Sequence, residues 1–214
     1  MVTKIADIRN EYIKNSLTKK SVAKDPIEQF NIWIKEALEA RVSEVNAMTL
    51  STVTLENRPS GRIVLLKGVE NDQFLFYTNY QSNKGKELDS NPYASLTFFW
   101  AELERQVRIE GKVKRVAPEV SDSYFYSRPI GSQIGAVTSP QSTPIDNREI
   151  LEERAMKLSK KYQNQTIQRP AQWGGYGVIP DRVEFWQGRA NRLHDRILYT
   201  LNDKNEWSTI RLAP

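Results

Sequence analysis

The sequence contains no cysteine and only one histidine, His194. Without thiols the chain forms no disulfide, binds no cysteine-ligated zinc or iron–sulfur cluster, and has no cysteine nucleophile. A single imidazole excludes a metal site built from several histidines and restricts histidine-based catalysis to one position. Any redox chemistry must therefore use a bound organic cofactor.

Other familiar patterns are missing as well. The N-terminus lacks the apolar core of a signal peptide, and no segment approaches the roughly 18–20 apolar residues of a membrane span. We therefore expect a soluble, cytoplasmic protein. No phosphate-binding GxxxxGK[ST] loop occurs, and the one incomplete GxGxxG, begun by Gly175 and Gly177, has Pro180 at its last glycine position. A typical NTPase or Rossmann dinucleotide site is disfavoured.

The composition is that of a folded domain. The chain has 214 residues, 39% of them hydrophobic, which is enough for one well-buried domain. Its formal net charge is +5. A basic excess of this size is compatible with nucleic acid, an acidic membrane surface or small anionic ligands such as phosphates, and equally with solubility alone.

Hydrophobic patterning predicts a mainly β protein with peripheral helices (α+β). Alternating and β-branched segments predict strands between residues 47 and 116 and again from residue 175. We expect helices after the caps Asp25 and Ser82, over 118–127, and over 146–162. The expected architecture is a small antiparallel barrel, with residues 1–24 as a mobile N-terminal arm and 25–214 as a single domain.

The C-terminal segment holds the most informative group of polar residues. Arg192, His194 and Arg196 alternate along the chain, so in a strand they would share one face. Cationic side chains gathered in this way repel one another unless an anion or a polar aromatic ligand lies between them. An anion site is one interpretation, and a solvated face with Arg–carboxylate pairs is the other.

Three further groups have spacings that suit a phosphate. Tyr124 and Arg128 are four apart on a predicted helix, and Ser132 follows in a loop bounded by proline and glycine. Lys84 lies in the first turn of the helix capped by Ser82, where free N–H groups favour anions. Both of these groups could instead be ordinary helix caps with surface charges, and the residues of the third group, described next, could simply flank a strand.

The strand RIVLLK forms the third group, with Arg62 and Lys67 at its ends. By parity these two side chains face opposite sides of a strand. A single site that uses both requires a bulge or a ligand that wraps around the strand end.

Taken together, the segments resemble the pyridoxamine 5′-phosphate oxidase family. The resemblance is strongest in VEFWQGRANRLHDR at 183–196, which matches the family pattern E-[FY]-W-Q, four residues, then R-L-H-D-R. The order of the remaining segments also fits, from about Arg9 to Pro214: RNEY, RIVLLK, FYTN with S-x-K, LERQV, YFYSRPIGSQIGA, PQS, WGGY and RLAP.

The resemblance implies an antiparallel, Greek-key-like FMN-binding split β-barrel that works as a homodimer with flavin at the interface. The implied reaction oxidises pyridoxamine or pyridoxine 5′-phosphate to pyridoxal 5′-phosphate, with O2 reduced to H2O2. It implies an FMN site formed by the residues Arg62, Ile63, Val64, Leu65, Leu66, Lys67, Tyr77, Thr78, Lys84, Gln106, Gln141, Ser142, Trp186 and Arg196.

For the substrate, the resemblance implies two groups of contacts. The substrate phosphate would be bound by Lys67, Tyr124, Arg128 and Ser132. Arg192 and His194 would be the catalytic residues and would contact the pyridine ring together with Leu193, under a lid that includes Arg9 and Tyr12. Asn83 stands where relatives commonly have an arginine. The resemblance implies that a missing cationic contact there would either weaken FMN binding or be compensated by a neighbour such as Lys86.

Three rival interpretations remain. Another split-barrel flavoprotein would share the barrel without needing RLHDR, and a non-catalytic protein could bind FMN or pyridoxal phosphate. A nucleic-acid-binding barrel would need exposed aromatics among lysines on one sheet face. Here the basic residues form small clusters, which favours neither nucleic acid nor a membrane as partner.

Overall fold

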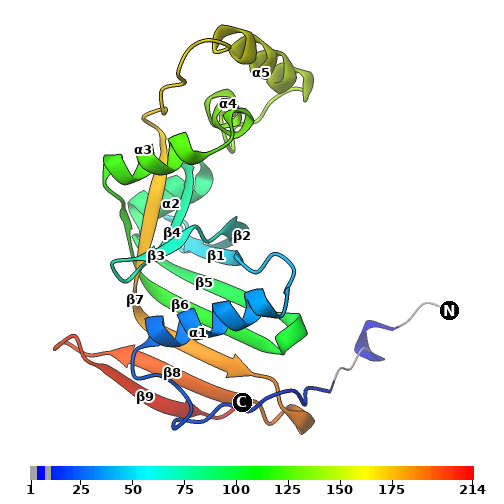
Figure 1. Cartoon of the computed structure of the whole chain (residues 1–214), viewed down its shortest axis with the longest axis vertical. Helices are drawn as coiled ribbons and strands as arrows, with labels where there is room; N and C mark the ends of the chain where they lie inside the picture. The colour runs from blue at the N-terminus through cyan, green and yellow to red at the C-terminus, as the bar shows by residue number, and fades with distance from the viewer. Residues whose placement is uncertain (1–3, 8–10) are drawn as a thin grey trace. The chain divides into compact units, whose positions relative to one another are not determined.

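The computed structural model describes residues 4–7 and 11–214 and is mainly β (Figure 1). The helices are α1 Pro26–Glu39, α2 Asn83–Ser90, α3 Pro118–Ser127, α4 Ile130–Thr138 and α5 Glu149–Lys161, with 3-10 turns at Ile5–Asp7, Ala101–Leu103 and Ala190–Arg192. The strands are β1 Ala47–Val53, β2 Pro59–Leu65, β3 Gly68–Glu70, β4 Gln73–Asn79, β5 Tyr93–Trp100, β6 Arg105–Arg115, β7 Trp173–Gln187, β8 Asp195–Leu201 and β9 Trp207–Leu212.

The strands of the described residues form a nine-stranded sheet in the order β2-β1-β5-β6-β7-β4-β3, with β8 paired to β7 and β9 to β8. The pairs β3–β4, β4–β7, β7–β8 and β8–β9 are all antiparallel. The predicted mainly β fold with peripheral helices is therefore confirmed. β7 runs without a break through Pro180.

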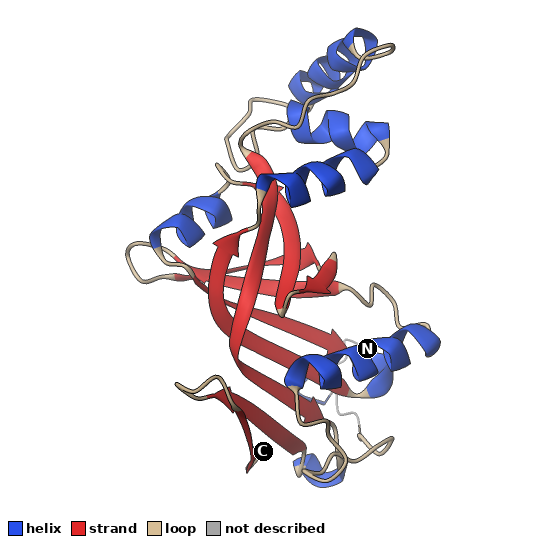
Figure 2. Cartoon of the chain, turned by 60° about the vertical axis from the view of Figure 1, so that its left-hand side comes forward, coloured by secondary structure: helices blue, strands red, loops and turns tan. Residues whose placement is uncertain are grey.

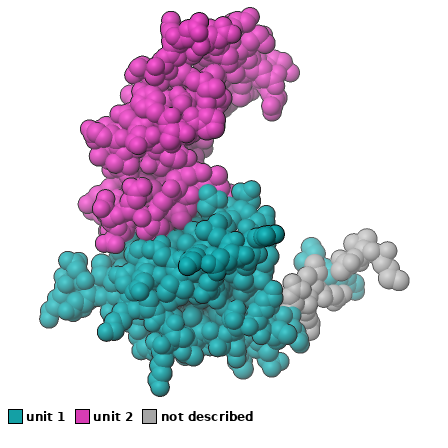
Figure 3. Space-filling model, viewed as in Figure 1, with its two compact units in different colours: residues 1–50, 95–111, 180–214 teal, residues 51–94, 112–179 magenta. Residues whose placement is uncertain are grey.

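The chain divides into two compact units (Figure 3). Unit 1 comprises residues 1–50, 95–111 and 180–214, and unit 2 comprises residues 51–94 and 112–179. The boundaries between the units fall within strands, so several strands have residues in both units. The boundary that we predicted at residue 25 stays a prediction.

Helix α1 covers the core of unit 1. It begins where the sequence predicts, because the Asp25 carboxylate accepts hydrogen bonds from the backbone N–H groups of Ile27 and Glu28. Its apolar face buries Phe30 against Phe98, with ring centroids 5.2 Å apart. Trp33 packs edge-on against Phe185 at 5.1 Å. Aromatic contacts of this kind fix the helix on the sheet.

The described part of the N-terminal arm contacts the rest of unit 1. The backbone N–H of Leu17 donates to the Asp195 carboxylate at 3.0 Å. The backbone N–H of Lys14 donates to Glu104, also at 3.0 Å. Leu17 itself is buried. Lys14 therefore lies against Glu104, and Leu17 against the segment that carries the sole histidine. The mobility of residues 1–24 as a whole stays a prediction.

In unit 2, helices α3, α4 and α5 gather at one end (Figure 1), and Figure 2 shows the same grouping from another side. They enclose a core of Phe125, Ile134, Ile167 and Trp173. Helix α3 ends at Ser127, as predicted from the Arg-Pro step that follows it. Helix α2 begins after Ser82, as predicted, and the Ser82 hydroxyl accepts from the N–H of Gly85.

Helix α4 corrects our prediction of a loop around Ser132. Gly131 and Gly135 suggested a loop, but both lie on the exposed side of a helix that starts directly after Pro129. Ile134 is buried in the core of the three helices. This burial outweighs the cost of about 1 kcal/mol for each helical glycine. Helix α5 begins at Glu149, three residues later than expected.

Candidate functional site

Unit 2 contains a cavity of about 690 Å³ that strands β2 and β4 and helices α2, α3 and α4 all help to form. This volume is typical of a small-molecule or cofactor site. Its lining includes twelve of the residues implied for the flavin and substrate sites: Arg62, Ile63, Val64, Leu65, Lys67, Tyr77, Thr78, Lys84, Tyr124, Arg128, Ser132 and Gln141. It also includes Asn79, Pro129, Gly135, Ala136, Ser139 and Trp173.

Arg62 and Lys67 both line this cavity although strand parity places them on opposite faces. Strand β2 ends at Leu65, so Lys67 lies beyond the strand and parity no longer applies to it. Leu66 is buried between them. The strand ends between the two cations, so both can line one cavity.

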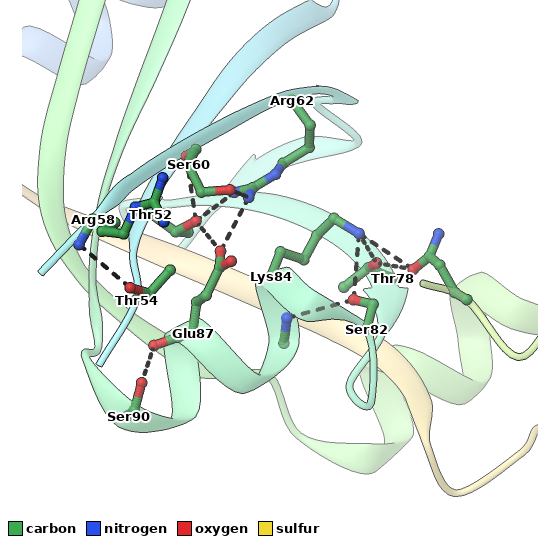
Figure 4. A network of polar contacts seen from close by, with 12 residues as sticks. Thr52, Thr54, Arg58, Ser60, Arg62, Thr78, Ser82, Lys84, Glu87 and Ser90 are labelled. Carbon is green, nitrogen blue, oxygen red and sulfur yellow. Dashed lines mark hydrogen bonds and ion pairs between the residues drawn. The ribbon is translucent and has the colours of Figure 1, made fainter. Parts of the chain in front are cut away.

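The Arg62 guanidinium is held by three side chains of unit 2 (Figure 4). Its Nη2 donates to Glu87 at 3.0 Å and also to the Ser60 hydroxyl, and its Nη1 donates to the Thr52 hydroxyl. The Glu87 carboxylate is largely buried, with 10% of its side chain exposed. The guanidinium is therefore oriented before any ligand arrives.

Lys84, from the first turn of α2, is a second cation in the cavity wall and is buried. Its ammonium donates at 3.3 Å to the hydroxyls of Thr78 and Ser82 and to the Gln141 side-chain oxygen. Burial lowers the pKa of Lys84, and the nearby Arg62 lowers it further, whereas Glu87 raises it. Two neighbouring cations of this kind favour an anionic ligand.

Stacked aromatic rings form another part of the wall. The rings of Tyr77 and Tyr124 stack with centroids 3.8 Å apart, and Trp173 lies nearly parallel to both. Gly175 makes room for this stack, because a Cβ there would lie 2.8 Å from the Tyr77 ring. Burial, followed by the charge of Glu70, raises the pKa of Tyr77 to about 12. Its phenol is therefore a neutral donor at physiological pH.

Arg128 is the most incompletely satisfied polar group of the cavity. Its guanidinium carbon lies 4.7 Å from the Trp173 ring centroid, a cation–π arrangement. Its Nη1 is buried and has no hydrogen-bond partner among the described residues. Burial lowers the pKa of Arg128, while Tyr124 partly offsets this. A partly buried guanidinium with an unused N–H, next to Tyr124 and Ser132 in the cavity lining, suits a phosphate.

The sole histidine lies in unit 1, within an aromatic group that includes Trp186 and Tyr12. The ring centroids of His194 and Trp186 are 4.7 Å apart, and those of His194 and Tyr12 are 5.8 Å apart. The backbone N–H of Arg189 donates to Nδ1 of His194 at 3.1 Å. Burial, followed by the charge of Arg192, lowers the pKa of His194. The neutral imidazole therefore carries its proton on Nε2.

Residues 192–196 do not form the continuous strand that we considered. Asn191 and Arg192 have positive φ values of 55° and 60°, and β8 begins only at Asp195. Strand alternation therefore does not place Arg192 and His194 on one face with Arg196. The Arg196 guanidinium forms the carboxylate pair that was the alternative interpretation: its Nε donates to Glu184 at 2.7 Å and its Nη2 at 3.1 Å.

The remaining predicted residues are placed as follows. Ser142 follows Gln141 with a φ of 69°, and neither it nor the buried Leu66 is among the described residues that line the cavity. Gln106 lies in β6 of unit 1, and Leu193 is 69% exposed. Asn83 is exposed at the start of α2. Arg9 lies outside the described residues.

Sequence reasoning missed Trp173 and Glu87. Trp173 opens the WGGY segment, which contributed to the family resemblance but was not assigned to a site. Glu87 follows Lys84 by three residues, so the two share one face of α2. That spacing could have indicated an acidic residue beside the predicted anion site.

Comparison with known proteins agrees with this geometry. A family model described as pyridoxamine 5′-phosphate oxidase matches residues 34–162. The chain belongs to the pyridoxamine 5′-phosphate oxidase family. A second model, described as the pyridoxine 5′-phosphate oxidase C-terminal dimerisation region, matches residues 173–214.

Relatives of this family match over the full chain. A pyridoxine/pyridoxamine 5′-phosphate oxidase of Chromobacterium violaceum is 56% identical over 214 residues, and one of Leptospira interrogans is 53% identical over 214 residues. In both cases the match covers 100% of this chain and 100% of the relative. Similarity of this extent shows that the chain is an oxidoreductase of the pyridoxamine 5′-phosphate oxidase family.

Two solved structures share the fold. PhzG from Burkholderia lata 383, in complex with tetrahydrophenazine-1-carboxylic acid, has a TM-score of 0.89 at 28% identity and covers 95% of this chain and 100% of its own. A pyridoxamine 5′-phosphate oxidase-related, FMN binding protein from Nostoc punctiforme has a TM-score of 0.72 at 18% identity, with coverage of 90% and 100%. The predicted split-barrel fold is confirmed. Within the described residues, no helix combines the length and apolar character needed to cross a membrane.

Proposed function

We propose that this chain oxidises pyridoxamine 5′-phosphate or pyridoxine 5′-phosphate to pyridoxal 5′-phosphate, with FMN as cofactor and O2 reduced to H2O2. The observation that supports this most directly is the cavity of unit 2. It is lined by two cationic groups from different segments, one with Arg62 and Lys84 and one with Arg128, and by stacked aromatic rings. Such a lining suits two phosphorylated ring compounds.

The residues present fit FMN. Arg62 and Lys84 are cations of the cavity wall and would bind the flavin phosphate, with the Thr78 and Gln141 side chains close to the Lys84 ammonium. When bound, FMN supplies a two-electron acceptor that O2 reoxidises. The exposed apolar side chains of Ile63 and Leu65 in the same lining provide surface for a flat ring.

The substrate phosphate would be bound by Arg128, Tyr124, Ser132 and Lys67. The buried Nη1 of Arg128 would gain the acceptor that it lacks among the described residues. Binding at a fixed point orients the ring of the substrate and lowers the entropic cost of reaching the reactive geometry.

Arg192 and His194 are proposed to contact the pyridine ring and its polar substituents, with Leu193 beside them. Since Nδ1 of His194 accepts from the Arg189 backbone, the Nε2–H is available as a donor. The positive charge of Arg192 would stabilise electron density that develops on the ring in the transition state. Trp186, Gln106, Ser142, Leu66, Val64 and Arg196 stay proposed flavin-site residues, and Tyr12 and Arg9 proposed parts of a lid.

We also propose that the chain acts as a homodimer. The match of residues 173–214 to a dimerisation region supports this assignment. β8 and β9 lie within that segment and pair with each other through six residue pairs. Sedimentation of the purified protein measures its mass directly, and a monomer at working concentration would contradict the proposal.

The test of the proposed function is spectroscopic and enzymatic. Purified protein should be yellow, should take up one FMN per chain, and should produce peroxide when pyridoxine 5′-phosphate is added. With pyridoxamine 5′-phosphate it should also release ammonia. Unphosphorylated pyridoxine is the control and should react far less. A colourless protein that takes up no FMN, or a yellow one that oxidises neither phosphate, would refute the assignment.

A further inference from the structure

Glu87 is an acidic residue buried beside a site that we expect to bind an anion. Only 9% of the residue is exposed, and it lies on α2 behind the cationic wall of the cavity. A buried carboxylate costs free energy unless it is paired, and here it also opposes the binding of a phosphate. Its position therefore requires a physical reason.

The contacts of Glu87 supply that reason. Its Oε2 accepts from Nη2 of Arg62 at 3.0 Å and from the Thr52 hydroxyl. The Thr52 hydroxyl in turn accepts from Nη1 of the same guanidinium. Both terminal nitrogens of Arg62 are thus tied directly or through one hydroxyl to a single carboxylate oxygen (Figure 4).

The elements that carry these side chains are themselves fixed. Ser82 caps α2, and Glu87 lies in the middle of that helix. Thr52 lies in β1 and Ser60 in β2, the strand that also carries Arg62. Glu87 therefore links the helix that provides Lys84 to the strand that provides Arg62.

Charge balance gives Glu87 a second effect. Arg62 and Lys84 are close enough for the arginine to lower the pKa of the lysine, and Glu87 acts in the opposite direction. The carboxylate therefore offsets part of the repulsion between these two partly buried cations. Removing one partner of a buried pair leaves the other charge uncompensated and free to reorient toward water.

We propose that Glu87 is a positioning residue that orients the Arg62 guanidinium toward the phosphate of the flavin nucleotide. This inference rests on the proposed function, since it takes FMN as the ligand. It assigns no contact between Glu87 and the ligand. Preorganisation of this kind increases affinity because the arginine side chain loses less conformational entropy on binding.

The direct effect of Glu87 on a phosphate has the opposite sign. Its negative charge repels the ligand, so a neutral replacement removes repulsion while it also releases Arg62. A double-mutant cycle separates the two effects, because direct repulsion is present whether or not Arg62 is there and cancels in the comparison.

The experiment measures the dissociation constants of FMN and riboflavin from the change in flavin fluorescence. Four proteins are compared: wild type, Glu87→Gln, Arg62→Met and the double variant. We expect Glu87→Gln to weaken FMN binding about tenfold more in the presence of Arg62 than in its absence. The dissociation constant of riboflavin, which has no phosphate, should change by less than about twofold, because the variant weakens only a charge-assisted contact to phosphate.

Asp89→Asn is the matched control. Asp89 is an acidic residue of the same helix that pairs with Arg115 at 2.8 Å and is half exposed. It should leave both flavin affinities unchanged. If Glu87→Gln does not fold, Thr52→Val takes its place in the same cycle, because it removes the hydroxyl that joins Glu87 to Arg62.

The outcomes are distinguishable. The positioning role is overturned if the effect of Glu87→Gln on the FMN dissociation constant differs by less than about threefold between the two Arg62 backgrounds. It is also overturned if the variant weakens FMN and riboflavin binding equally. A wild-type protein that binds no FMN would instead refute the proposed function. A coupling of threefold or more that is confined to FMN supports the inference.

Discussion

Arg128→Met should reduce affinity for the phosphorylated substrate while leaving the stability of the protein nearly unchanged. In the structure, Nη1 of Arg128 is buried without a partner among the described residues. An unsatisfied buried donor costs about 1–3 kcal/mol. The cation–π contact with Trp173, at 4.7 Å, returns about 0.5–2 kcal/mol. These terms nearly offset each other, so methionine should change the free energy of unfolding by no more than about 1 kcal/mol.

The effect on binding should be much larger. A hydrogen bond between charged groups contributes about 1.5–3 kcal/mol, which corresponds to about a 10- to 150-fold loss of affinity. We expect the KM for pyridoxine 5′-phosphate to rise by about this factor, with FMN affinity within about twofold of wild type because a different cationic group binds its phosphate. Peroxide production gives KM, and thermal unfolding gives stability, where 1 kcal/mol corresponds to about 2–4 °C for a chain of this length.

The control for Arg128→Met is Arg148→Met, the same change at an arginine whose side chain is 84% exposed. It should alter neither KM nor FMN affinity. The reasoning is refuted if Arg128→Met raises KM equally for unphosphorylated pyridoxine, or if KM does not change. A loss of more than about 2 kcal/mol of stability would show that the guanidinium is structural.

Three further outcomes are expected. Arg192→Ala should lose far more turnover than bound flavin, whereas Lys84→Ala should mainly loosen FMN, by about tenfold. Flavin content and kcat of both variants check this, and equal flavin loss would contradict it. The imidazole of His194, followed by NMR as the sole histidine, should titrate below 6.5, and its pKa should rise in Arg192→Ala; a midpoint at or above 6.5 would contradict the assigned cause. Gly175→Ala should lower stability by about 1–3 kcal/mol because its Cβ would lie 2.8 Å from two side chains, whereas Gly131→Ala, with open space around it, should stabilise by up to about 1 kcal/mol in thermal melts.

The His194 prediction has a defined sign. A lowered pKa means that folding disfavours the charged imidazolium, so the unfolded chain binds the proton more readily. His194 titration therefore leaves the free energy of unfolding unchanged well above pH 6.5. It lowers that free energy as the pH falls through the pKa of the unfolded chain. The neutral form, which has a single N–H donor, is the one present at physiological pH.

Local sequence rules predicted the elements that local chemistry determines. Asp25 and Ser82 cap helices because their side chains accept from nearby backbone N–H groups, and the Arg-Pro step ends α3. These interactions span only a few residues, so they are visible in the sequence. The family resemblance then collected twelve residues from distant segments into one predicted site, and the structure places them in one cavity.

What the sequence did not predict depends on tertiary contacts. Helix α4 contains two glycines and forms because Ile134 packs into a core with Phe125 and Trp173. The prediction that Arg192 and His194 alternate along a strand was wrong because Asn191 and Arg192 adopt positive φ values. A local sequence pattern does not reveal these φ values, because the tertiary turn that requires them is not visible in it.

The Arg62 network shows why a list of cations is an incomplete description of an anion site. Arg62 was predicted from its strand, yet its orientation is set by Glu87 and Thr52, which come from a helix and another strand. A guanidinium on an exposed strand residue samples many rotamers, and its affinity for phosphate depends on how few of them remain. A buried carboxylate that pairs with the guanidinium reduces the number of rotamers, although its negative charge also repels the phosphate. Under the proposed assignment, the affinity of the site for phosphate therefore depends on Glu87, which makes no proposed contact with the ligand, as well as on the cations proposed to bind it.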